Sequence, residues 1–207
     1  MPLQKLILVI FSSLLYAMAQ PNEFFHYGST MLGFIALIPF FHTLFTCGSL
    51  KESILAGAVF GLLSTSMIYF WLLFFEDFSV WTLSGVVAAH TLYFIILSPF
   101  ITLTGKYGTL RPFLTAAVWI GYEYLKSIGY AGFPWGLMAQ STGIAPFVQI
   151  ADITGQWGIS FLIVLFNTMI LETILIKKKR LISSWIFTAV LMIGSISYGI
   201  YINHKEI

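Results

Sequence analysis

The sequence predicts an all-α membrane protein with about seven transmembrane helices and one re-entrant or interfacial loop. Only 9% of its residues are charged and 58% are hydrophobic, whereas a soluble domain carries roughly 25% charged residues. Long uncharged runs approach the roughly 20 residues that a helix needs to cross a bilayer. These runs lack the alternation with a period of two that an outer-membrane barrel strand requires. A soluble fold and a barrel are therefore disfavoured.

We expect residues 1–207 to form a single transmembrane domain, because apolar runs follow one another along the whole chain. The first and fifth runs are short and need interfacial residues to complete a crossing. The first run also fits a cleavable signal peptide, since Lys5 precedes an apolar stretch that ends in small residues. We favour an uncleaved first helix. The predicted spans are residues 3–19, 28–45, 53–75, 80–104, 112–128, 154–176 and 181–202.

The basic residues indicate how the chain would lie in the membrane. Eight of the ten Lys and Arg residues fall in linkers that would share one side, and such linkers are typical of the cytoplasmic side. We therefore expect the N-terminus in the cytoplasm and the C-terminus outside it. The eight are Lys5, Lys51, Lys106, Arg111 and residues 177–180, whereas Lys126 and Lys205 fall on the other side.

The composition argues against several kinds of site. Cys47 is the only cysteine, which excludes an intramolecular disulfide and a cysteine-rich metal cluster. We interpret it as a small packing residue, with palmitoylation as the alternative. His90 has no second ligand at metal spacing and is interpreted as a hydrogen-bond donor between helices. We expect no metal and no cofactor. We also expect no nucleic-acid partner, since no basic surface carries stacking aromatics.

Three residues of the fifth span share one helical face. Trp119, Glu123 and Lys126 are spaced at i, i+4 and i+7. A carboxylate at the rim of a membrane helix is costly and usually has a partner. Two interpretations stay open. Glu123 and Lys126 form a local ion pair that pins the helix end, or the face is a polar notch that receives a lipid headgroup or a partner domain.

Residues 129–145 predict an interruption of the helical pattern. Gly132 and Gly136 flank Pro134, which fixes one dihedral angle and lacks an N–H, so a helix does not run through them. Broken backbone at membrane depth needs protein or water around its amides. We therefore expect a re-entrant or interfacial loop, capped by Phe133 and Trp135.

Glutamines accompany this loop and the segment after it. Gln149 is the one that we single out, together with Gln140 and Gln156. Their amides would bind phosphate or ester oxygens, or would satisfy the loop's own backbone.

These positions resemble the membrane-domain signature of bacterial apolipoprotein N-acyltransferases, in which Trp, Glu and Arg precede a GFPW motif. The likeness continues through residues 149–151 and 155–162 and through the glycines of the third span, so it covers essentially the whole chain. Lys126 stands where the family usually has Arg, and Met138-Ala139 replaces a Gly-Tyr pair. The matching residues are Trp119, Glu123 and Lys126, then Gly132, Phe133, Pro134 and Trp135.

The resemblance implies transfer of an acyl chain from a phospholipid to the diacylglyceryl-cysteine of a lipoprotein, on the outer face of the bacterial cytoplasmic (inner) membrane. In the family, a Glu–Lys–Cys triad in a nitrilase-like domain after the seventh helix performs the chemistry. The five residues after Ile202 in this sequence are too few to form such a domain. We therefore expect a truncated, anchoring chain that is inactive alone and has no catalytic residue. Three origins stay open: a split gene with a separately encoded nitrilase-like domain as partner, an interrupted reading frame, or a degenerate paralogue.

The same resemblance implies a vestibule for two lipidated substrates, the phospholipid donor and the lipoprotein acceptor. Phe133, Pro134 and Trp135 would line its mouth. The alternative is a non-enzymatic lipid-binding protein or a small transporter-like protein. Transporters usually carry midplane charges and repeated broken helices, and the sequence indicates one broken region and no internal repeat.

Overall fold

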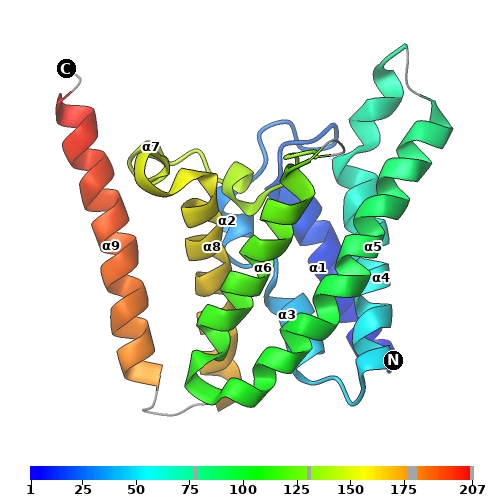
Figure 1. The fold of residues 1–207 in the computed structure, drawn as a ribbon, viewed down its shortest axis with the longest axis horizontal. Coiled ribbons are helices and arrows are strands. Elements are labelled where there is room, and N and C mark those ends of the chain that lie inside the picture. The colour runs from blue at the N-terminus through cyan, green and yellow to red at the C-terminus, as the bar shows by residue number, and fades with distance from the viewer. Residues whose placement is uncertain (77–78, 130–131, 177–180, 206–207) are drawn as a thin grey trace.

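The computed structural model describes residues 1–76, 79–129, 132–176 and 181–205, and within them the chain is helical with no β-strand (Figure 1). This confirms the all-α fold. The α-helices are α1 Leu3–Ala19, α2 Thr30–Gly33, α3 Ile38–Phe45, α4 Leu50–Ile68, α5 Val80–Thr104, α6 Arg111–Ser127, α7 Ala145–Val148, α8 Ala151–Ile176 and α9 Ile182–Lys205. The short 3-10 helices are η1 Phe70–Phe74, η2 Gly105–Leu110 and η3 Met138–Ser141.

Four of the described segments are long and apolar enough to cross a membrane. One of them contains both α5 and α6, which η2 joins, and α1 and the α2–α3 segment are shorter apolar helices. These elements follow the predicted spans in order along the chain, but the second and third spans differ from the prediction. The four segments are Leu50–Ile68, Val80–Ser127, Ala151–Leu175 and Ile182–Lys205.

The predicted second span is wrong as a single helix, because it is broken between α2 and α3. Pro39 lies in the first turn of α3, where its missing N–H is tolerated. Asn167 of α8 fills the gap: its Oδ1 accepts from the Leu37 backbone N–H at 3.0 Å, and its Nδ2 donates to the Gly33 carbonyl at 2.9 Å. The broken backbone is thus satisfied by protein, as membrane depth demands.

The predicted third span also ends early. Its helix, α4, stops at Ile68, and the aromatic residues that follow form η1. Within α4, Gly57 and Gly61 let α5 approach closely, and α5 lies directly against both glycines. A Cβ atom on Gly57 would lie 2.3 Å from the Phe94 carbonyl oxygen, and one on Gly61 would lie 2.9 Å from the Cα atom of Thr91. Small residues permit this spacing between membrane helices.

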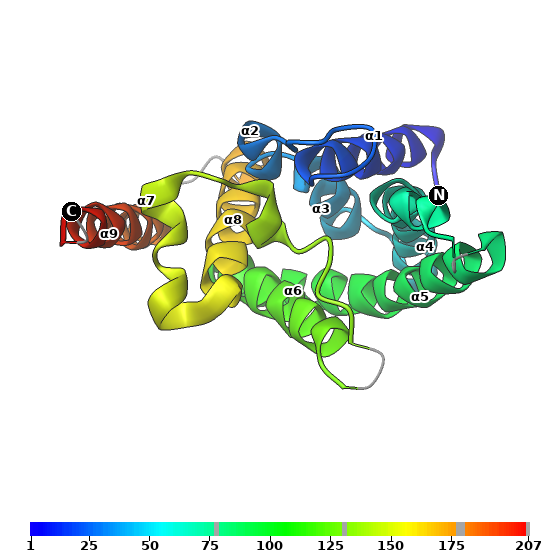
Figure 2. The ribbon, with the colours of Figure 1, turned by 90° about the horizontal axis from the view of Figure 1, so that it is seen from above.

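The two ends of the bundle hold different connections and different chain termini. The N-terminus and the α3–α4 connection lie at one end, and the C-terminus, α7 and the connection from α6 to α7 lie at the other (Figure 1). Seen from above, that last connection crosses the top of the bundle, while α9 stands to one side next to α7 (Figure 2). The predicted basic cluster at 177–180 lies outside the described residues, as do 77–78, 130–131 and 206–207.

Candidate functional site

The site lies where the C-terminal end of α6 meets the loop formed by residues 132–141. Glu123 of α6 is fully buried. Its Oε1 accepts from the Trp119 indole N–H at 2.9 Å and from the Met138 backbone N–H at 2.7 Å. The helical face predicted from the i, i+4 spacing therefore exists, and it faces the loop. One carboxylate oxygen joins α6 to the loop.

Lys126 contacts the same loop through different atoms. Its Nζ donates to the carbonyls of Trp135 at 2.9 Å and of Gly136 at 3.1 Å. The interpretation of a local ion pair with Glu123 is therefore wrong. The loop folds back over the end of α6, and its carbonyls, which have no helical donors, lie within reach of the lysine. The other Glu123 oxygen, Oε2, is buried and makes no hydrogen bond of standard geometry among the described residues, although the Ser160 hydroxyl lies close enough to interact with the carboxylate.

The loop is also held by its own side chains. Gly136 has a φ of 68°, in the left-handed region that glycine adopts without strain. The Gln140 Oε1 accepts from the backbone N–H groups of Gly136 at 2.7 Å and Leu137 at 3.2 Å, and its Nε2 donates to the Pro134 carbonyl at 3.0 Å. Gln140 thus satisfies the loop's own backbone, one of the two roles considered for the glutamines.

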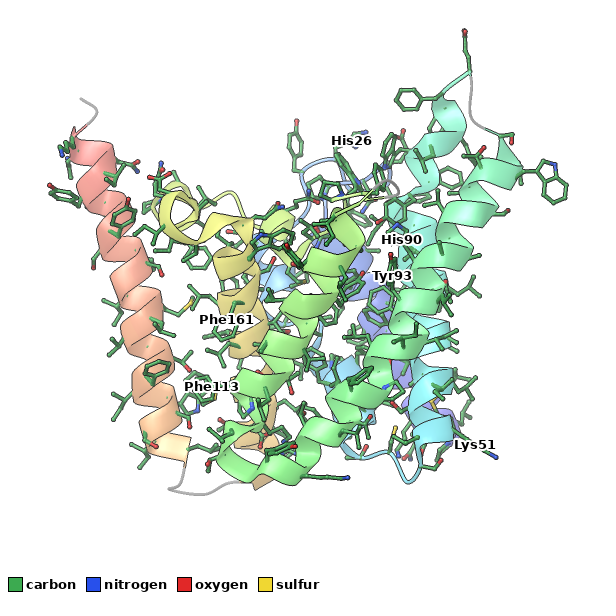
Figure 3. The ribbon with its side chains drawn as sticks, in the orientation of Figure 1. His26, Lys51, His90, Tyr93, Phe113 and Phe161 are labelled. Atoms are coloured by element: carbon green, nitrogen blue, oxygen red, sulfur yellow. The ribbon has the colours of Figure 1, made fainter. Side chains whose placement is uncertain are left out.

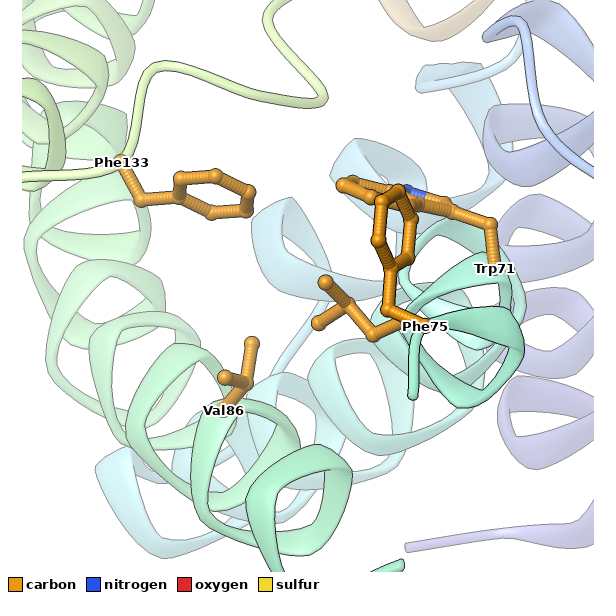
Figure 4. A pocket seen from close by; sticks show the side chains of 5 residues that line it. Trp71, Phe75, Val86 and Phe133 are labelled. Atoms are coloured by element: carbon orange, nitrogen blue, oxygen red, sulfur yellow. The ribbon is translucent and has the colours of Figure 1, made fainter. Parts of the chain in front are cut away.

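An apolar pocket of about 410 Å³ opens beside the loop. Phe133 points into it from the loop, opposite Trp71 (Figure 4). Trp135 is 38% exposed and lies next to the pocket wall, with its ring centroid 5.3 Å from that of Trp71. Pro134 is exposed and lies outside the lining. The lining residues are Trp71, Leu72, Phe75, Val86 and Phe133.

The structure does not bring Gln149 to this cluster. Its Nε2 donates to the Asn203 Oδ1 of α9 at 2.9 Å, so it joins the segment after α7 to α9. His90 lies at the loop's end of the bundle, opposite to Lys51 (Figure 3). The His90 ring stacks on Tyr69 at 4.6 Å, and its Nδ1 has no partner within the described part of the chain. The donor role of His90 between helices stays a prediction.

Two tyrosines belong to the site although they were not among the predicted site residues. The Tyr16 hydroxyl of α1 donates to the Gly136 carbonyl at 2.7 Å, and the Tyr69 hydroxyl donates to the Trp135 carbonyl at 2.9 Å. The available signal was a phenol inside an apolar run, because a buried Tyr hydroxyl usually finds a partner.

A second buried charge lies at the other end of α6. Arg111 forms a two-pronged ion pair with Glu172 of α8, in which Nε meets Oε1 and Nη2 meets Oε2 at 2.7 Å. Glu172 is fully buried, and the guanidinium carbon lies 4.4 Å from the centre of the Phe45 ring. Glu172 was also missed, although an acidic residue inside an apolar run signals a partner.

The thiol is set apart from these groups. Cys47 lies in the α3–α4 connection, at the end of the bundle opposite the loop (Figure 1). Burial, and then the nearby Glu52 carboxylate, raise the pKa of the Cys47 thiol, which favours the unreactive protonated form. Within the described ranges, no group of three His, Cys, Asp or Glu residues could hold a metal ion.

Comparison with known proteins places this geometry in context. A family model described as the apolipoprotein N-acyltransferase N-terminal domain matches residues 12–169. Apolipoprotein N-acyltransferase 2 of Treponema denticola is 37% identical over 81% of this chain and 32% of that protein. Its namesake in Treponema pallidum is 32% identical over 92% of this chain and 35% of that protein. Apolipoprotein N-acyltransferase of Borreliella burgdorferi is 30% identical over 93% and 37%, respectively. The chain therefore spans about a third of the length of these relatives.

Proposed function

Because this chain belongs to the apolipoprotein N-acyltransferase family through its N-terminal domain, we propose that it is the membrane part of an enzyme that transfers an acyl chain from phospholipid to the diacylglyceryl-cysteine of lipoproteins. Its role is to anchor that enzyme and to form the lipid vestibule. We propose that residues 1–207 act as one transmembrane domain. The observation that carries the proposal is the apolar pocket beside a loop that α6 holds in place.

The pocket and loop suit acyl chains with an ester group attached. An apolar cavity lined by aromatic rings accepts hydrocarbon, and orientation then comes from a few polar groups at its edge. The Trp71 indole N–H is buried without a partner among the residues described, and we propose that it donates to an ester oxygen when a lipid enters the pocket that Trp71 lines. Phe133, Pro134 and Trp135 would form the mouth through which the two lipidated substrates enter.

We propose that the covalent chemistry is performed outside these 207 residues. A cysteine nucleophile needs a base and a group that lowers its pKa close by. Cys47 instead lies at the opposite end of the bundle from Glu123 and Lys126, with its pKa raised. A nitrilase-like domain, encoded separately or elsewhere in the same protein, would supply the catalytic triad, and this chain would be inactive alone.

The orientation is part of the proposal. We place the chain in the bacterial cytoplasmic membrane with the N-terminus in the cytoplasm. The start of α1, the start of α4 and the α5–α6 connection lie at the end of the bundle away from the loop (Figure 1). They carry Lys5, Lys51, Lys106 and Arg111, which suits the cytoplasmic side. The loop and the C-terminus would then face outwards, where lipoproteins are acylated.

Photocrosslinking in lipid nanodiscs tests the vestibule in this chain. A phospholipid with a photoactivatable acyl chain is expected to label the peptides that hold Trp71 and Phe133. An excess of diacylated lipopeptide should suppress that labelling, because both lipids would share the pocket. The matched control is the groove between α5 and α6 lined by Ile96, Phe100 and Val118, where labelling should resist competition. Equal competition at both places would remove the vestibule role.

The broken span between α2 and α3 gives the transporter-like alternative one observation in its favour, since discontinuous helices are common in transporters. However, the broken backbone at Gly33 and Leu37 is bonded to the buried Asn167 side chain. The amide of Asn167 is therefore already engaged and is not vacant for a substrate. Flux of a soluble solute through vesicles that contain only this chain would favour the alternative.

A further inference from the structure

Two consecutive carbonyl groups in the loop are held by side chains from different helices. The Trp135 oxygen accepts from the Tyr69 hydroxyl and from Lys126 Nζ, both at 2.9 Å. The Gly136 oxygen accepts from the Tyr16 hydroxyl at 2.7 Å and from Lys126 Nζ at 3.1 Å. The donors lie on α1, directly after α4 and on α6. All three donor residues are at most 3% exposed.

The number of donors is informative. A carbonyl oxygen has two lone pairs, so each of these oxygens has its full complement of hydrogen bonds from protein. Loop carbonyls at membrane depth require donors, but one donor each would remove most of the desolvation penalty. Because side chains from three separate segments donate to these two oxygens, the peptide groups are fixed in position in three dimensions. Trp135, which carries the first of the two carbonyls, is thereby held at the edge of the apolar pocket.

We propose that Tyr16 and Tyr69 are positioning residues, whose hydroxyls hold the Trp135 and Gly136 carbonyls and thereby place the Trp135 and Phe133 rings at the pocket. This deepens the proposed function and rests on it for its biological meaning. The hydroxyls act on the loop and touch no reacting atom. Tyr16 is notable because the residue that it holds lies 120 positions further along the chain. The first helix would therefore set the geometry of a loop that it does not adjoin in sequence.

The tyrosine rings are positioned independently of their hydroxyls. The Tyr16 ring packs against Phe60 at 5.5 Å and Trp119 at 5.9 Å. The Tyr69 ring packs against His90 and, at 5.6 Å, against Phe133. Tyr→Phe substitutions therefore keep these contacts and remove only the hydrogen bonds. This makes Tyr16→Phe and Tyr69→Phe clean tests that are expected to fold.

Hydrogen exchange of the whole chain in lipid nanodiscs measures how tightly the loop is held. Loss of one hydroxyl should raise the exchange rate of the 132–141 peptide about fivefold, the factor expected for one net hydrogen bond in local opening. Peptides from α4 and α5 should exchange as in the parent chain. The matched control is Tyr93→Phe, because the Tyr93 hydroxyl makes no hydrogen bond within the described part of the chain. Unchanged loop exchange in both variants, or an equal increase in every peptide, would overturn the proposal.

A spectroscopic readout follows Trp135 directly. In chain labelled with fluorotryptophan, the fluorine resonance that disappears in Trp135→Phe belongs to Trp135. That resonance should shift in Tyr16→Phe and in Tyr69→Phe but remain in place in Tyr93→Phe. A fixed resonance in both variants would contradict positioning. These readouts require no acyl transfer, so they stand even where the photocrosslinking test removes the vestibule role.

Discussion

The two ends of α6 each bury charged groups, and they use them in opposite ways. At the N-terminal end, Arg111 and Glu172 satisfy one another in a two-pronged ion pair between α6 and α8. At the C-terminal end, Glu123 and Lys126 each bind the backbone of the loop. The first arrangement joins two helices and leaves little for a ligand to bind. The second makes the position of a loop depend on two charged side chains.

The difference indicates which end is structural and which is suited to function. A buried ion pair whose two partners satisfy each other fixes helix packing, and the protein loses much stability when one partner is removed. Charges that hold a loop can respond to what the loop contacts, and one Glu123 oxygen makes no hydrogen bond of standard geometry within the described structure. Rigid helices that position an irregular segment are a common way to build a binding site.

The largest effect on the free energy of unfolding is expected at the Arg111–Glu172 ion pair. Arg111→Met leaves the fully buried Glu172 carboxylate without its partner and should reduce the free energy of unfolding by about 3–5 kcal/mol. Detergent-denaturant titration of the purified chain, followed by tryptophan fluorescence, measures this. The double variant Arg111→Met/Glu172→Met should recover most of the loss, because no charge is then left buried. A double variant as unstable as the single one would show that Arg111 and Glu172 do more than satisfy each other's charge.

A smaller and more local effect is expected at Glu123. Glu123→Ala removes the acceptor for the Met138 N–H and the Trp119 indole, and unpaired buried donors cost about 1–3 kcal/mol. Glu123→Gln keeps a carbonyl oxygen that can accept both bonds and should lose less. Hydrogen exchange should place the change in residues 132–141, with α8 protected as before. A global increase in exchange would show that Glu123 stabilises the whole bundle, as the Arg111–Glu172 pair does, and not the loop alone.

Lys126→Arg should have little effect, below about 1 kcal/mol. A guanidinium offers five N–H donors, enough to reach the carbonyls of Trp135 and Gly136 that Lys126 now bonds. Thermal denaturation in nanodiscs compares Lys126→Arg with Lys126→Met, which lacks donors and should loosen the loop. Equal loss in the two variants would show that side-chain shape, and not hydrogen bonding, is what the loop requires.

Local patterns in the sequence predicted the helices and the loop, because those depend on hydropathy and on Gly and Pro within a few residues. The break between α2 and α3 was missed because the partner that makes it tolerable, Asn167, lies 130 positions from Leu37. The shared face of Trp119, Glu123 and Lys126 was predicted by helix periodicity. The acceptors of Lys126 could not be, because they depend on how the loop returns over α6.

Gln149 is where the smallest effect is expected, although residues 149–151 belong to the pattern that resembles the family. Its amide bonds to Asn203 near the end of α9, so Gln149→Ala should change the stability of the loop by less than about 0.5 kcal/mol. Exchange of the 132–141 peptide should match the parent chain, while the C-terminal turn of α9 exchanges faster. If the loop responded instead, α7 and α9 would be coupled to the pocket. In that case α9, in addition to α6, would help to position the loop residues that form the proposed mouth of the pocket.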